Sequence, residues 1–508
     1  MSQIDPRHTD PPEAGVTAPA ADGVLCPSSI ASALAARLPP SWLPELCAVV
    51  GEANVLQQPA DLWAYCRDRS PYAMFNVRNA RVPATLPAAV AHPGSVAEVS
   101  AILRLSRRRG IAVIPFGAGS GVMGGALPIA HELVVDLKRL NGLLAIDEVD
   151  GTATVQAGMN GGQFEAALNA RGFTSGHYPQ SLHMSTVGGW AACRSAGQSS
   201  TRYGKFEDMV LGFEVVLPDG ELLRIRPAPG RAVGPGLQDL FLGSEGALGI
   251  ITEVTLRLWR LPEARHGVVL AFPTLESGLD TLRRAMQSEL RPSVARLYDQ
   301  EESAQRTSGT PPFDSHRLLA ILEFSGSSRL AALERDLTLE IARSAGAVEA
   351  DNRLYLEWLK HRYVSYSTPW YARGYFNDTI EVTGRWSVLP LMYAAMRESI
   401  AAIAPDAHFG VHWSHFYPEG ACQYMTLRLP PMPDERALAQ MRRAWDAIVQ
   451  ECHRQGGSMS HHHGVGLFRA QWMRAEHGSG LDIIAALKRH LDPDQLLLPG
   501  KLGLDDPL

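Results

Sequence analysis

Three consecutive histidines, His461, His462 and His463, are the side chains of this 508-residue sequence that most clearly suit acid–base chemistry. An imidazole can accept or donate a proton near neutral pH. The run is internal and has glycines on both sides, which indicates a loop of a folded domain. We therefore predict that the run faces a substrate, with a solvated loop as the alternative.

A metal site is a second interpretation, because imidazole is also a common metal ligand. Further ligands could come from His408, His412 and His415. Adjacent residues point to different sides of the chain, so three histidines in a row cannot all ligate one ion well. We therefore expect no metal.

A glycine-rich segment, residues 116–125, directly follows an apolar stretch that has the composition of a short buried strand. Glycine lacks a Cβ and accepts positive φ angles, so backbone amides there can approach a pyrophosphate closely. The segment is not a Walker A loop, because neither LysSer nor LysThr follows it. Gly119, Gly121 and Gly124 fit GxGxxG, but ProIleAlaHis at 128–131 opens a helix poorly. A Rossmann site is therefore the weaker prediction.

Further loops of small residues follow in strand context, at 184–190, 193–197, 203–204 and 243–249. One such loop would say little. Several of them in order indicate one extended ligand held along a groove. The sequence therefore predicts a cofactor site.

In the order PFGAGSGVMGG, STVGGW and GSEGALGII, these segments resemble the FAD-linked oxidase family, which has the vanillyl-alcohol-oxidase or PCMH type of FAD-binding fold. The resemblance covers nearly everything after about Leu86 and implies FAD. Members that attach flavin through a histidine near the glycine loop carry it in that loop. This loop has no histidine, so noncovalent FAD is expected. The cofactor-binding residues implied are Pro115, Phe116, Gly117, Ala118, Gly119, Ser120, Gly121, Gln180, Ser181, Ser185, Thr186, Gly188, Gly189, Cys193, Arg194, Ser195, Ala196, Glu245, Gly246, Gly249, Ile250 and Ile251.

Within that family, SHHHGVG at 460–466 is similar to the alkyldihydroxyacetonephosphate synthase branch. The similarity implies catalytic roles for the three histidines and for Tyr417, whose phenol could shuttle a proton at a flavin. It also places Arg373 near the reacting site, where a guanidinium suits a carboxylate or phosphate. The alternatives are a buried structural tyrosine and a surface ion pair.

The sequence departs from the family pattern in two places, one among the residues that would lie beside the flavin and one in the cap. Gln180 and His183 stand where the branch usually has Asp and Glu, and residues 414–420 lack the GlyAspGlyAsn of FAD-linked 2-hydroxy-acid dehydrogenases. Arg296 is a further anion-binding candidate, with an ordinary salt bridge as its alternative. Lys501, in the closing segment of the chain, is expected to be structural.

Hydrophobic spacing and turn residues predict alternating strands and helices. A helix over 96–109 has Ser95 as its N-cap and Gly110 at its end, and a helix over 275–290 has Thr274 as its N-cap. The other predicted elements are short helices between 29 and 50, strands at 111–115, 133–137, 152–157, 255–259, 268–272 and 318–323, a strand and hairpin turn within 209–221, and helices at 161–170 and 330–345.

These elements predict an α+β protein with a two-subdomain PCMH-type FAD-binding domain and an α+β cap. We divide the chain into a disordered tail, a helical segment, the FAD-binding domain, the cap, and a segment that returns to the FAD-binding domain. The corresponding ranges are 1–25, 26–85, 86–262, 263–455 and 456–508.

The composition of the chain limits the classes of molecule that it can be expected to bind. The 53 acidic and 47 basic side chains are well mixed, which disfavours nucleic acid. The six cysteines lack CxxC spacing, and no apolar stretch reaches the roughly 18 residues of a membrane span. We expect a cytoplasmic protein without a transmembrane segment, with a small-molecule substrate, an unidentified electron acceptor and a homodimer as one option for its assembly.

Three functions fit these observations. The first is an FAD-dependent oxidoreductase that acts on a CH–OH group of a small anionic substrate, either a hydroxy acid or a phosphorylated compound. The second is the synthase reaction itself, which exchanges acyl for alkyl in ether-lipid synthesis without net redox change. The third is a non-catalytic flavin-binding protein, which the density of histidine, tyrosine and arginine in the cap disfavours.

Overall fold

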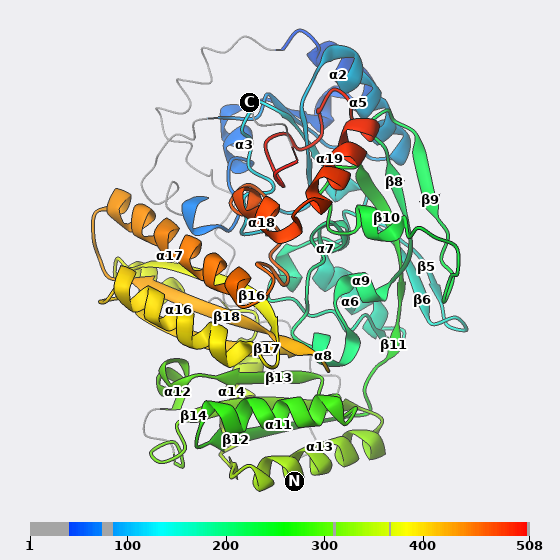
Figure 1. The fold of residues 1–508 in the computed structure, drawn as a ribbon. Helices are drawn as coiled ribbons and strands as arrows, with labels where there is room; N and C mark the ends of the chain where they lie inside the picture. The colour runs from blue at the N-terminus through cyan, green and yellow to red at the C-terminus, as the bar shows by residue number, and fades with distance from the viewer. Residues whose placement is uncertain (1–39, 74–84, 308–310, 365–366, 505–508) are drawn as a thin grey trace.

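Three main sheets arranged in two halves make up the molecule (Figure 1). The computed structural model describes residues 40–73, 85–307, 311–364 and 367–504. The expected tail and the part of the helical segment before residue 40 lie outside the described residues. A four-stranded and a five-stranded sheet lie in the upper half of Figure 1, and a seven-stranded sheet lies in the lower half. The α+β prediction is confirmed.

The four-stranded sheet carries the glycine-rich segment at the end of one of its strands. Its order is β1 (Val55–Leu56), β2 (Ala89–Ala91), β4 (Leu133–Asp136) and β3 (Val113–Phe116), and the last three are parallel. Parallel strands are covered on both faces, which explains their continuous apolar runs. The predicted helix α5 (Val96–Arg109) covers this sheet, and its Ser95 cap accepts a hydrogen bond from Glu98 N at 3.2 Å.

The five-stranded sheet is antiparallel and supports two helices. Its order is β5 (Leu143–Asp147), β6 (Thr152–Gln156), β10 (Ile250–Arg257), β8 (Val210–Val216) and β9 (Leu222–Ile225). Helix α6 (Gly161–Asn169) was expected, but α7 (Val187–Cys193) lies in a segment expected to be a loop. A Cβ at Gly188 would lie 2.5 Å from the Ala157 Cβ, so glycine inside α7 allows the helix to approach the sheet.

The seven-stranded sheet has two chemically different faces. Its order is β15 (Val348–Glu349), β12 (Ala264–Phe272), β14 (Leu318–Gly326), β13 (Val294–Tyr298), β17 (His408–Phe416), β18 (Gly420–Leu429) and β16 (Phe376–Arg385). Alternate residues form an apolar core with α11 (Leu275–Gln287), α13 (Ser328–Ser344), α16 (Leu389–Ile403) and α17 (Asp434–Arg454). On β12 and β14 the intervening residues form a second apolar cluster with Tyr355 and Trp358. At Arg296 of β13 and along β17 and β18 the intervening residues, which include His412, Tyr424 and Arg428, are polar. We call the surface formed by these four residues the polar face of the cap sheet.

The shorter elements connect these layers. They are α2 (Leu43–Val50), α3 (Pro59–Ala64), β7 (Phe173–Thr174), α8 (Ser200–Tyr203), α9 (Phe206–Met209), α10 (Gln238–Phe241), β11 (Trp259–Arg260), α12 (Gln300–Thr307), α14 (Arg353–His361), α15 (Thr368–Ala372), α18 (Met473–His477) and α19 (Gly480–Leu491). Among the described residues, no helix has the length and apolar character that a membrane crossing needs.

The end of the chain returns to the first sheet (Figure 1). Leu497 forms a parallel bridge with Val113 of β3, beside helix α19. The buried Lys488 of α19 donates to the carbonyls of Ala247 at 3.0 Å and Leu497 at 2.8 Å, and it pairs with the buried carboxylate of Asp492. One ammonium group thus joins the C-terminal segment 488–497 to Ala247, which is 241 residues away in sequence.

Lys488→Met should lower the free energy of unfolding by about 3–5 kcal/mol, because Asp492 is then left buried without its counter-charge. Urea unfolding followed by circular dichroism measures the change. Arg474→Ala is the matched control, since its pair with Asp482 is exposed and its loss should leave stability nearly unchanged. An equal effect of the two substitutions would contradict the structural role of Lys488.

Candidate active site

A cavity of about 660 Å³ lies between the first two sheets and the polar face of the cap sheet. Its lining combines the glycine-rich segment, the start of α7, residues 245–251 and the strands β13, β16, β17 and β18. The volume is in the range of cofactor and ligand sites, and such sites often lie between domains. Small residues line one side of the cavity, and titratable side chains line the other.

The structure brings together almost all of the predicted cofactor residues. Those in the lining are Pro115, Phe116, Gly117, Ala118, Gly119, Ser120, Gly121, Gln180, Ser181, Ser185, Thr186, Gly188, Gly189, Cys193, Ser195, Ala196, Glu245, Gly246, Gly249, Ile250 and Ile251. Arg194 is absent from the lining. It ends α7 in the left-handed conformation and donates to the carbonyls of Leu242 and Asp239, each at 2.8 Å.

Glycine is required where the loop of the first sheet meets α7. A Cβ at Gly117 would lie 2.3 Å from Oγ1 of Thr186, the residue that caps α7. Gly121 also lines the cavity, and a Cβ there would have no atom within 4 Å. The main chain therefore lies next to open space, as a cradle for an extended cofactor requires.

Glu245 joins the cofactor side of the cavity to residues 460–466, the loop that carries the three consecutive histidines. We call this segment the histidine loop. Its carboxylate is buried and accepts hydrogen bonds from Val465 N at 2.6 Å and Gly466 N at 2.9 Å. Burial raises the pKa of Glu245 to about 7, although these two hydrogen bonds favour the ionised form. The histidine loop is thereby fixed relative to residues 245–251.

Glu381 of β16 holds the histidine loop from the cap side. Its carboxylate accepts from the backbone N–H groups of His461 at 2.9 Å and His463 at 2.8 Å, and from the buried Arg469 guanidinium at 3.0 Å. Burial alone would raise the pKa of Glu381, but the Arg469 guanidinium lowers it below its ordinary value. An ionised carboxylate thus organises the loop.

Tyr417, His461 and His462 form a chain of hydrogen bonds that leads to the cavity. The Tyr417 hydroxyl lies 2.7 Å from His461 Nε2, and His461 Nδ1 lies 2.9 Å from His462 Nδ1. His462 and His463 line the cavity, whereas His461 and Tyr417 lie behind them. The predicted catalytic histidines and tyrosine are therefore brought together, and His462 forms the cavity end of the chain.

These histidines are neutral because they are buried. Burial lowers the pKa of His461 and His462 well below 6.5, and nearby histidines lower it further. Burial also lowers the pKa of His463 to about 4. Each ring therefore offers one donor and one acceptor nitrogen near neutral pH.

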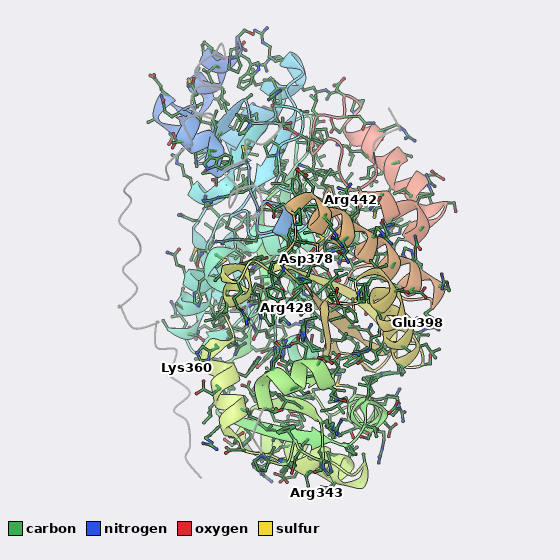
Figure 2. All side chains as sticks on the ribbon, turned by 90° about the vertical axis from the view of Figure 1, so that its left-hand side faces the viewer. Arg343, Lys360, Asp378, Glu398, Arg428 and Arg442 are labelled. Atoms are coloured by element: carbon green, nitrogen blue, oxygen red, sulfur yellow. The ribbon has the colours of Figure 1, made fainter. Side chains whose placement is uncertain are left out.

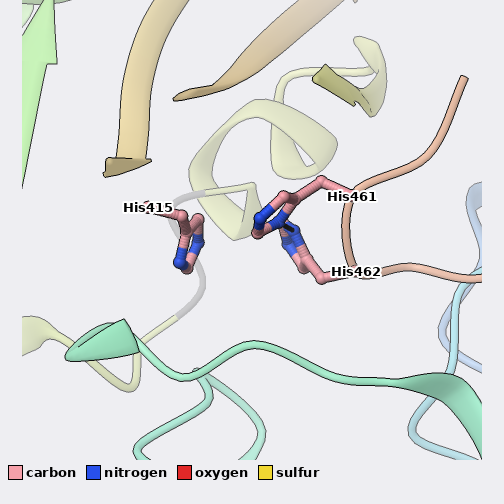
Figure 3. Close-up of side chains that lie close together, drawn as sticks. All are labelled: His415, His461 and His462. Atoms are coloured by element: carbon pink, nitrogen blue, oxygen red, sulfur yellow. Dashed lines mark hydrogen bonds between the residues drawn. The ribbon is translucent and has the colours of Figure 1, made fainter. Parts of the chain in front are cut away.

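His415 approaches this chain from the end of β17 (Figure 3). One ligand atom from each of His415, His461 and His462 lies within 4.8 Å of the others. Two of the three consecutive histidines can thus face one centre together with His415, and this group could hold a metal ion. However, His415 Nδ1 is 2.6 Å from Ser200 Oγ, and no carboxylate of the described residues joins the three rings. The contacts fit acid–base chemistry better than a cation site.

The two candidate arginines are placed differently. Arg296 lines the cavity, and its Nη2 lies 2.7 Å from His412 Nε2. Since a guanidinium only donates, His412 must accept at this nitrogen, and burial lowers the pKa of His412 well below 6.5. Arg373 is exposed at the end of α15 and lies over the Trp370 ring, at 4.2 Å from its centroid. It is not among the lining residues, so the structure does not bring it to the histidines.

Several lining residues were missed from the sequence, namely Asp68, Arg306, Arg362, Asp378, Tyr424 and Arg428. Tyr424 and Arg428 alternate with apolar residues along β18, and this alternation was the available signal. The alternation shows that Tyr424 and Arg428 share one face of the strand, but it does not identify the strands that pair with β18. The others come from segments without a recognisable pattern.

Comparison with known proteins agrees with this geometry. Residues 87–226 match the FAD binding domain family, and residues 261–502 match the FAD linked oxidases, C-terminal domain family. The chain is 33% identical over 435 residues to an uncharacterized FAD-linked oxidoreductase, YgcU, of Escherichia coli K12, with 82% of this chain and 89% of YgcU covered. It is 30% identical over 463 residues to D-2-hydroxyglutarate dehydrogenase of Xanthomonas citri pv. viticola, with 88% and 93% covered.

A solved structure of alkyldihydroxyacetonephosphate synthase matches the whole arrangement. Its TM-score is 0.76 at 26% identity, and the match covers 91% of this chain and 86% of that chain. The match extends over both halves of the molecule. It supports the expected FAD-binding fold with a cap, and together with the family matches it identifies FAD as the cofactor.

Gly121→Leu should yield a folded protein that purifies with little or no FAD, because the new side chain projects into open space in the cavity. Absorbance near 450 nm measures the flavin content, and thermal unfolding measures the fold. Gly480→Leu is the control, since a Cβ at Gly480 would make only an ordinary contact, 3.9 Å from the His477 Cβ, and Gly480 lies on α19, outside the lining. Full flavin content in Gly121→Leu would place the cofactor elsewhere.

Proposed function

We propose that this chain, which belongs to the FAD-linked oxidase family, is an oxidoreductase that acts on a CH–OH group of a small anionic substrate. The observation that supports this function is the polar face of the cap sheet, which holds Arg296 in the same cavity as His462. An anion binder and a neutral base are thus available together. Bound FAD, held noncovalently, supplies the two-electron acceptor for a hydride that leaves the substrate carbon.

His462 is the proposed base for the hydroxyl proton. When the Nε2–H of His461 donates to the Tyr417 oxygen, His461 Nδ1 accepts from His462 Nδ1–H. His462 Nε2 then has a free lone pair. The direction of the hydrogen bonds in the chain therefore decides whether His462 can accept the proton, which makes Tyr417 and His461 positioning residues.

Arg296 is the proposed anion-binding residue. Its Nε donates to the Tyr298 hydroxyl at 2.8 Å and its Nη2 to His412, so two contacts fix the guanidinium plane. Neither partner carries a negative charge. The charge of Arg296 therefore remains available to a substrate carboxylate or phosphate, which a planar guanidinium can bind with two hydrogen bonds.

The synthase reaction is the second candidate. The contact between Tyr417 and His461 joins two of the segments that resemble that branch, and the similarity to the solved synthase covers most of the chain. Fold similarity does not fix the reaction. Purely non-catalytic flavin binding is disfavoured, because the fold keeps several neutral histidines buried against the cavity.

Anaerobic mixing of the purified holoenzyme with 2-hydroxy acids and phosphorylated alcohols should bleach the oxidised flavin absorbance with at least one compound. A parallel mixture with acyl-dihydroxyacetonephosphate and a fatty alcohol is analysed for ether product. Bleaching without ether product supports the oxidoreductase. Ether product with an unchanged final flavin redox state would overturn the oxidoreductase proposal in favour of the synthase. The absence of both bleaching and ether product would favour flavin binding without catalysis.

His462→Ala should lower kcat by about 10²–10⁴-fold, the usual contribution of a positioned proton-transfer group, while flavin content stays normal. Tyr417→Phe should also lower kcat with normal flavin content, because it removes the hydrogen bond that orients His461. Single-turnover bleaching with the substrate found above measures the rate. Tyr72→Phe is the matched control, because Tyr72 is 44% exposed and outside the lining. Wild-type rates in both site variants would remove the hydrogen-bonded chain from the mechanism.

A further inference from the structure

A second guanidinium, that of Arg428, lies in the same cavity as Arg296. Figure 2 shows Arg428 near the middle of the molecule, whereas Arg343 and Lys360 lie at its periphery. The side chain of Arg428 is 5% exposed. Its Nε and Nη1 have no hydrogen-bond partner among the described residues. Buried N–H groups that lack hydrogen-bond acceptors mark a place where a ligand can supply them.

The charge around Arg428 is not balanced. The nearest carboxylate belongs to Glu302, at 3.6 Å from Nη1, which is too long for a hydrogen bond. Glu302 already pairs with Arg306 at 2.6 Å, through its other oxygen. One carboxylate therefore serves two guanidinium groups, so the three side chains Glu302, Arg306 and Arg428 together carry one more positive than negative charge.

Strand register places Arg428 away from the histidines. Tyr424 pairs with His412 across β17 and β18, and its ring stacks on His462 with centroids 5.9 Å apart. Arg428 is four residues further along β18 and on the same face, opposite Asn377 of β16. At about 3.3 Å per residue, the two positions are roughly 13 Å apart along the strand. Thr426 lies between them in the cavity lining.

The environment of Arg428 is polar. Asn377 is 2% exposed, and its Oδ1 also lacks a partner among the described residues. The Arg428 guanidinium lies over the Trp370 ring at 4.6 Å from its centroid, which leaves its edge for hydrogen bonds. An alkyl chain would leave these groups buried and unpaired, at a cost that a carboxylate or phosphate avoids.

We propose that the substrate is an elongated dianion and that Arg428 binds its distal carboxylate or phosphate. This inference rests on the proposed function, in which Arg296 binds the anionic group next to the reacting carbon. The substrate then extends over the polar face of the cap sheet, with one charge at each arginine. A compound with a single carboxylate leaves Nε and Nη1 of Arg428 without hydrogen-bond acceptors.

The test is binding to the oxidised holoenzyme, which needs no turnover. The probes are α,ω-dicarboxylates from succinate to sebacate, each compared with the monocarboxylate of the same chain length. Calorimetry and the perturbation of the flavin spectrum give the affinities. At least one dicarboxylate should bind about 10- to 100-fold more tightly than its monocarboxylate, as one charge-assisted hydrogen-bonded contact allows. No preference at any length would overturn the proposal.

Arg428→Met should abolish the dicarboxylate preference and leave monocarboxylate binding unchanged. Arg373→Met is the matched control, because Arg373 lies over the same Trp370 ring but outside the cavity, and it should keep the preference. Loss of the preference in both variants, or in neither, would contradict the role of Arg428. The comparison of probes on the wild-type protein remains valid if Arg428→Met fails to fold.

The source of the distal charge is resolved by ω-phosphorylated monocarboxylates of the same lengths. Tighter binding of these compounds than of the dicarboxylates assigns a phosphate, and weaker binding assigns a carboxylate. An Arg428-dependent preference without any flavin bleaching would keep this site and overturn the proposed oxidation. Bleaching by hydroxy monocarboxylates without a dicarboxylate preference would support the proposed oxidation and overturn the role of Arg428 in binding a distal charge.

Discussion

The buried carboxylate of Glu381 is the interaction on which the site depends. It binds backbone amides of the histidine loop and the guanidinium of Arg469, and neither it nor Arg469 is reached by solvent. A buried ion pair contributes little net stability, because desolvation offsets attraction. Its value here is geometric, since it fixes which histidine nitrogens face the cavity. Glu245 fixes the same loop from the other side of the cavity.

The two faces of the cap sheet explain how one element serves both stability and chemistry. Every second residue of β17 and β18 enters the apolar core under α16 and α17. The residues between them are free to be polar, and burial in the cavity keeps His412 neutral while Arg296 stays charged beside it. A shift of register by one residue would exchange the faces and destroy both functions. The helices on the core side therefore define the site indirectly.

Local sequence rules predicted the cofactor side well, because it is built from local signals. The Ser95 cap, the Gly110 end and the glycine-rich segment after β3 are each encoded within a few residues. The helix α7 was missed because its glycines resemble a loop, although they serve close packing on Ala157. The cap side was predicted less well. Arg428 meets Asn377 only through strand pairing, and no local pattern specifies which strands pair.

Arg373 illustrates the limit of assigning roles by resemblance of short segments. Its chemistry suits an anion, yet it lies at the exposed end of α15, where its charge is screened by water. Arg296 and Arg428 have the same chemistry with much less water around them, and an ionic contact is stronger where the surroundings are less polar. The proposed anion specificity of the cavity therefore rests on burial and strand register rather than on the number of arginines in the cap. One half-buried cation, Arg296, and one buried cation, Arg428, on the same polar face are the reason for proposing a doubly charged substrate rather than a lipid, even though the segments that carry the histidines and Tyr417 resemble those of a lipid-forming branch.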